Sequence, residues 1–89
     1  FEGGFSMKKR IIMGIQIGNR TEDASEVQNL LTEYGCIIKT RLGLHEASTI
    51  CSPSGLIIIE FVVGEEEKVI ELEKKLGLIE SVKVRKMEF

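Results

Sequence analysis

The residue types best suited to chemistry gather in one segment of this sequence, between positions 45 and 54. His45 is the only histidine in the chain, and Cys51 follows it six residues later. Imidazole and thiolate groups both bind soft transition metals, so His45 and Cys51 are the candidates for a metal site. Their spacing matches no specific metal motif, and the chain has one other cysteine, Cys36. We therefore expect neither a bound metal nor another cofactor.

The same segment holds groups that a nearby base would have to activate for nucleophilic catalysis. Ser48, Ser52 and Cys51 are the candidate nucleophiles, and His45 is the candidate base, with Glu46 behind it. Closeness along the chain is poor evidence for the geometry that such a triad needs. The sequence also contains no glycine-rich phosphate-binding signature. We expect a protein that is not an enzyme.

A second candidate site is the turn formed by Gly18, Asn19 and Arg20. It follows an apolar segment and precedes Thr21, whose hydroxyl is suited to begin a helix. Free amide groups at such a turn, with the Arg20 guanidinium, are suited to an anionic or amino-acid ligand. A plain strand-to-helix turn explains the same residue types. Both interpretations remain open at this point.

Periodicity predicts the elements that position these residues. Apolar residues alternate from Lys8 to Ile17, which is typical of a strand. Apolar spacings of three and four predict a helix from Thr21 to Tyr34, stopped by Gly35 in the left-handed conformation. A second strand is expected from Cys36 to Leu44. On that strand we expect three apolar side chains to share one side: Ile38, Leu42 and Leu44.

The second half of the sequence repeats this order after a loop from His45 to Gly55. Leu56 to Val63 is strongly apolar and predicts a central strand. Acidic residues before position 68 and two lysines before Gly77 predict a helix between them, and Ile79 to Lys86 predicts a last strand. The whole order predicts an α+β, ferredoxin-like βαββαβ sandwich, a four-stranded antiparallel sheet with two helices on one face.

This architecture leaves one face of the sheet uncovered. The side chains expected there are Ile12, Gln16, Leu56, Ile58, Glu60 and Val62. Four of the six are aliphatic, and an exposed apolar patch usually marks an interface. We therefore predict a homo-oligomer, a dimer or a tetramer, that assembles through this face.

Composition and charge exclude several classes of partner. The formal net charge is −2, so no overall positive field attracts nucleic acid or an acidic membrane surface. No secretory pattern or apolar run of membrane length occurs, which predicts a cytoplasmic protein. Residues 1–6, ahead of Met7, have the composition of an expression scar, and we expect residues 7–89 to form a single domain.

Several stretches in order resemble the family of regulators assigned to the iron-only hydrogenase system. They are Arg10 to Ile17, Leu30 to Gly35, Arg41 to Leu44, Gly55 to Ile59, and Leu76 to Val84. The resemblance implies a ferredoxin-like domain similar to ACT domains and to the C-terminal domain of the nickel-responsive repressor. It also implies a non-enzymatic regulatory module with a protein partner in hydrogenase maturation or regulation.

The similarity to ACT domains implies an alternative function, that of a small-molecule sensor for amino acids. In those domains the ligand commonly binds at the turn after the first strand. That turn corresponds to Gly18, Asn19 and Arg20 in this sequence.

Overall fold

The computed structural model describes residues 9–18, 21–44 and 55–89. These residues form four β-strands, two α-helices and one short 3-10 helix. In chain order the elements are β1 (Ile11–Ile17), α1 (Thr21–Glu33), η1 (Gly35–Ile37), β2 (Ile38–Leu44), β3 (Gly55–Phe61), α2 (Glu66–Gly77) and β4 (Val82–Glu88).

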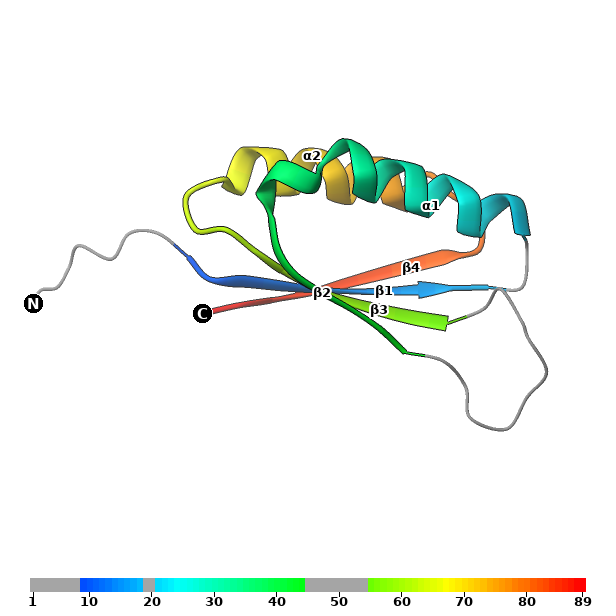
Figure 1. Ribbon diagram of the computed structural model, residues 1–89, viewed down its shortest axis with the longest axis horizontal. Helices are drawn as coiled ribbons and strands as arrows, with labels where there is room; N and C mark the ends of the chain where they lie inside the picture. The colour runs from blue at the N-terminus through cyan, green and yellow to red at the C-terminus, as the bar shows by residue number, and fades with distance from the viewer. Residues whose placement is uncertain (1–8, 19–20, 45–54) are drawn as a thin grey trace, which may run out of the picture.

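The four strands form one antiparallel sheet in the order β2-β3-β1-β4, and both helices lie on the same face of it (Figure 1). This arrangement confirms the predicted ferredoxin-like sandwich. β1 is central and pairs with β3 on one side and with β4 on the other. Its residues therefore have neighbours on both sides, which makes it the reference strand for the uncovered face.

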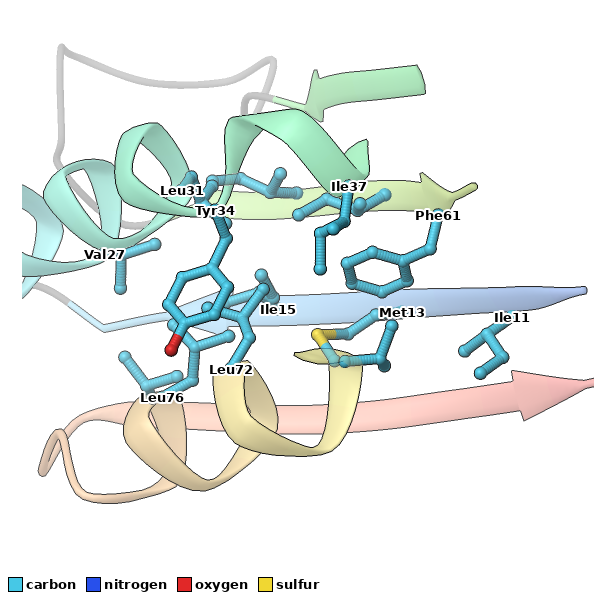
Figure 2. Packing of buried hydrophobic residues seen from close by; sticks show 14 of the residues in the cluster. Ile11, Met13, Ile15, Val27, Leu31, Tyr34, Ile37, Phe61, Leu72 and Leu76 are labelled. Atoms are coloured by element: carbon cyan, nitrogen blue, oxygen red, sulfur yellow. The ribbon is translucent and has the colours of Figure 1, made fainter. Parts of the chain in front are cut away.

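The core fills the space between the sheet and the two helices. Alternate residues of β1 point into it, as the period of two requires, and α1 and α2 contribute residues three or four positions apart. Figure 2 shows the Tyr34 ring extending from the end of α1 toward α2, above the central strand. The largest fully buried side chains are those of Phe61, Met13, Ile15, Leu31, Ile59, Leu72 and Leu76, followed by Val27 and Val69.

The end of α1 differs from the sequence prediction. Gly35 does not end α1 in the left-handed conformation, and it begins η1 instead. The Tyr34 carbonyl accepts the Ile37 N–H at 3.1 Å, so α1 ends by tightening into a 3-10 turn, which needs no left-handed residue. Within the described ranges the glycine with a positive φ is Gly64, at 97°, between β3 and α2.

β2 contains an irregularity that the sequence did not reveal. Ile38 pairs with Phe61 and Thr40 pairs with Glu60, so the register shifts between these two pairs. A shift of one residue turns the following side chains to the other face of the sheet. Ile38 consequently packs against the core, whereas Leu42 pairs with Ile58 and is exposed. The expectation that Ile38 and Leu42 share one side is wrong for this reason.

Candidate functional site

The sheet face opposite the helices carries three rows of cross-strand neighbours. The pairings of β1 with β3 and β4, and of β2 with β3, define these rows from one edge of the sheet to the other. The first row is Thr40, Glu60, Ile12 and Met87, the second is Leu42, Ile58, Gly14 and Arg85, and the third includes Leu56, Gln16 and Lys83. No element within the described ranges covers this face (Figure 1).

The apolar side chains of this uncovered face occupy adjacent strands. Leu42 is 54% exposed, Leu56 is 36% exposed and Met87 is 56% exposed. Between them lie Ile12 and Ile58, which are partly buried. Exposed apolar side chains grouped in this way are typical of a surface that packs against another molecule.

The structure places five of the six predicted interface residues on the uncovered face: Ile12, Gln16, Leu56, Ile58 and Glu60. Val62 lies elsewhere, because it follows the end of β3 and packs against the core. Its N–H donates to the Ile37 carbonyl at 2.9 Å. That this face is an interface stays a prediction.

Sequence reasoning missed six residues of the uncovered face: Gly14, Thr40, Leu42, Lys83, Arg85 and Met87. Leu42 was expected to share a side with Ile38, and the shift in β2 separates the two. The three β4 residues alternate with Val82 and Val84, and this alternation was the available signal that they share the other face.

One end of the uncovered face has its negative charge neutralised within the chain. Glu60 Oε2 lies 3.5 Å from Arg10 Nε and 3.8 Å from Lys39 Nζ. The Thr40 hydroxyl donates to Glu60 Oε1 at 3.3 Å. The Glu60 carboxylate is therefore held by three groups of the chain, so its charge needs no cation from another molecule.

The other end of the face contains a shallow hollow of about 350 Å³. It is lined by Gly14, Gln16, Leu56, Lys83 and Arg85. The side chain of Arg85 donates from Nη1 to the Val84 carbonyl at 2.8 Å, which steadies the guanidinium at the rim. This hollow brings two cations and one amide together beside an apolar side chain.

A second hollow, of about 320 Å³, lies where the end of α1 and η1 meets α2. The Tyr34 hydroxyl donates to Glu71 Oε1 at 2.9 Å, and Lys75 Nζ lies 3.6 Å from Glu33 Oε2. The hydrogen bond with Tyr34 is the main cause that raises the pKa of Lys75 above its ordinary value. Tyr34, Glu71, Lys75 and Glu33 at this hollow are thus paired within the fold.

The turn predicted to bind a ligand is described only at Gly18. The Gly18 N–H donates to the Ser81 carbonyl at 3.1 Å, so this amide is already used within the fold. Asn19 and Arg20 lie outside the described residues, and so do His45 and Cys51. The ligand site at this turn and the loop metal site stay predictions.

The described ranges contain neither a metal-binding cluster nor a membrane-spanning helix. No group of three or more His, Cys, Asp or Glu residues is placed there to hold a metal ion. None of the helices described is long and apolar enough to cross a membrane. The cytoplasmic location stays a prediction.

The element order, the antiparallel sheet and the two helices on one face define a ferredoxin-like α+β protein. The family model described as "TM1266-like: Iron-only hydrogenase system regulator, putative" matches residues 9–86, and the chain belongs to this family. The family that the sequence resembles is thereby confirmed.

A solved structure shows the same fold. The chain is similar to the uncharacterized protein TM1266 from Thermotoga maritima, with a TM-score of 0.78 and 22% identity over 92% of this chain and 98% of that chain. A structure of CPII bound to ADP, AMP and acetate, from Thiomonas intermedia K12, has a TM-score of 0.46 and 19% identity over 91% of this chain and 88% of that chain. No curated protein matches the chain significantly.

Proposed function

We propose that this protein is a non-enzymatic regulatory module of an iron-only hydrogenase system, and that it works as a homo-oligomer assembled through its uncovered sheet face. The observation that carries the proposal is the apolar surface on that face, where Leu42, Leu56 and Met87 are exposed on three different strands. The family supports the regulatory part of the proposal.

A second copy of the chain is the occupant that fits this face best. Two sheets that pack face to face bring their apolar side chains together about 10 Å apart and exclude water from both. The charged end of the face at Glu60 is already neutralised by Arg10 and Lys39, so covering it leaves no unpaired carboxylate there. A small domain also gains stability from association, because it buries little surface alone.

A regulatory role without catalysis is supported by the chemistry of the described residues. The residues described on the uncovered face include no nucleophile paired with a base, and the ionic groups there serve the fold or line the hollow. A non-enzymatic regulator acts through the surfaces that it exposes to its partners, and self-association controls which surfaces are exposed.

Light scattering coupled to gel filtration tests the assembly. At micromolar concentration we expect a mass of a dimer or a tetramer for the wild type. Leu42→Lys and Leu56→Lys place a charge on the uncovered face and are expected to shift the protein to monomer. Leu78→Lys is the matched control, because Leu78 is 86% exposed at the end of α2, away from that face.

Two results would contradict the assembly. One is a wild type that is monomeric throughout the micromolar range, and the other is an equal loss of mass in the Leu78→Lys control. The hydrogenase connection has its own test, which is the recovery of hydrogenase maturation proteins with the tagged chain from the native organism. Recovery with the wild type and its loss with Leu42→Lys would tie partner binding to the same face.

A further inference from the structure

The hollow on the uncovered face carries an inference beyond self-association. Because Gly14 has no side chain, the middle of the face is open between its neighbours on β3 and β4. The hollow measures about 350 Å³, at the lower end of the range for small-molecule pockets. Leu56 lines it from β3, and Lys83 and Arg85 line it from β4. One side of the hollow is therefore apolar and the other is cationic.

The two cations have no acidic partner in the described part of the chain. The carboxylates there that form ion pairs do so with other basic residues, and none lies within 4.0 Å of Lys83 or Arg85. Arg85 donates one of its five N–H groups to the Val84 carbonyl, and the other four are available to a ligand. The Gln16 side chain adds an uncharged donor at the same rim. A guanidinium beside an ammonium matches the geometry of an oxyanion.

The register of the strands sets the length of a ligand that would contact both the apolar and the cationic side of the hollow. Gln16 pairs with Leu56 on one side and with Lys83 on the other, so these three residues form one row. Neighbouring strands are about 4.8 Å apart, which places the backbones of Leu56 and Lys83 about 10 Å from each other. A ligand that spans this row has an oxyanion at one end and a short hydrocarbon chain at the other.

We propose that the hollow binds a small organic oxyanion with an aliphatic tail. Lys83 and Arg85 hold the charged end, Gln16 donates to it, and Leu56 covers the tail. A second copy packed over the face would bury the two cations, and unpaired buried charges are costly. The bound anion offsets this cost, so it strengthens the assembly through the face.

Nuclear magnetic resonance titration of the whole chain tests the inference. The probe is 4-methylpentanoate, whose carboxylate and branched tail match the two ends of the hollow. Phosphate tests for an oxyanion without a tail, and 4-methylpentanol tests for the tail without charge, all at one ionic strength. For 4-methylpentanoate we expect a Kd of about 1 mM, as is usual for a small ligand in an open site. Amide shifts should centre on the hollow.

Variants identify the groups that bind. Arg85→Gln and Lys83→Gln are each expected to weaken binding about tenfold, since each removes a charge-assisted hydrogen bond. Gly14→Leu fills the hollow and should abolish binding, and a Cβ at this position meets Ile58 at 3.8 Å, an ordinary contact. Lys74→Gln removes an equal charge from the exposed side of α2 and should leave the Kd unchanged.

Several results would overturn the inference. These are amide shifts centred away from the hollow, equal affinity for phosphate or 4-methylpentanol, and equal weakening by Lys74→Gln. Failure of this inference is distinguishable from failure of the proposed function, because mass is measured on the same samples. An oligomer that binds no probe would refute the ligand and leave the assembly standing. A strict monomer that binds the probe at the hollow would refute the assembly and leave ligand binding standing.

Discussion

Ser81 lies directly against Gly18, and the contact joins the end of β1 to the turn before β4. The Gly18 N–H donates to the Ser81 carbonyl at 3.1 Å, and a Cβ added at Gly18 would stand 2.8 Å from the Ser81 Cβ. Real Cβ atoms essentially never approach so closely. The glycine at this position is therefore required by packing, and its amide serves the fold.

Gly18→Ala is expected to lower the free energy of unfolding by about 1 to 3 kcal/mol, because the added methyl group forces the Ser81 segment to move. Urea unfolding followed by circular dichroism measures the change. Gly43→Ala is the control, since among the described residues no atom beyond its two chain neighbours lies within 4 Å of a Cβ placed there. An equal loss in both variants would show that the contact with Ser81 is not the cause.

Asp23 supports the same junction from the first turn of α1. Its carboxylate is buried and accepts the Ser81 N–H at 3.2 Å. Asp23→Ala leaves that N–H without its acceptor, and we expect a loss of about 1 to 3 kcal/mol of stability by thermal or urea unfolding. Asp23→Asn keeps an acceptor oxygen and should recover part of the loss.

Glu22→Ala separates this effect from the helix dipole, because Glu22 is an exposed carboxylate in the same turn. Removing a charge there should cost about 0.3 to 1 kcal/mol at most. A loss as large as that of Asp23→Ala would mean that Asp23 acts through the dipole and not through Ser81.

The fold was predictable because its signals are local. The alternating isoleucines of β1 and the apolar spacing of α1 each require only neighbouring residues, and a sheet with two crossovers follows from their order. Ser81 shows what local signals miss. Nothing near position 81 in the sequence indicates that it meets Gly18, since that contact arises only once β4 pairs with β1.

The candidate site was predictable in part for the same reason. Ile12 and Leu56 follow from alternation within their own strands, and both lie on the uncovered face. The hollow could not be predicted from the sequence. It lies over Gly14 of β1, which has no side chain, and it is lined by Lys83 and Arg85 of the neighbouring strand β4. The register that brings these residues together depends on long-range pairing, which alternation within one strand does not contain.

Tyr34 connects the two helices through its hydroxyl. The ring is buried in the core (Figure 2). The hydroxyl donates to Glu71 Oε1 at 2.9 Å. Tyr34→Phe keeps the ring in the core and removes the hydrogen bond, so we expect a loss of about 0.5 to 1.5 kcal/mol in urea unfolding. In a Glu71→Gln background, whose side chain still accepts, the loss should persist. A neutral Tyr34→Phe would show that the bond contributes nothing.

Lys86 links β4 to α2, and its ion pair predicts how stability changes at high pH. Lys86 Nζ lies 3.0 Å from Glu73 Oε1 and 3.5 Å from Glu88 Oε2, and its side chain is only 18% exposed. The hydrogen bond with Glu73 is the main cause that raises the pKa of Lys86 above its ordinary value of 10.5, while burial acts in the opposite direction.

Because the folded state raises this pKa, the ion pair stabilises the protein fully below the unfolded value of 10.5, and this stabilisation is lost as the pH rises through the folded pKa. Lys86→Gln is expected to cost about 0.5 to 1 kcal/mol at neutral pH. Urea unfolding should show a gap between wild type and variant that is constant up to about pH 10 and narrows as the pH rises further. Lys83→Gln, on the same strand without an acidic partner among the described residues, should show no such narrowing. A gap for Lys86→Gln that is constant with pH would place its effect in packing and not in charge.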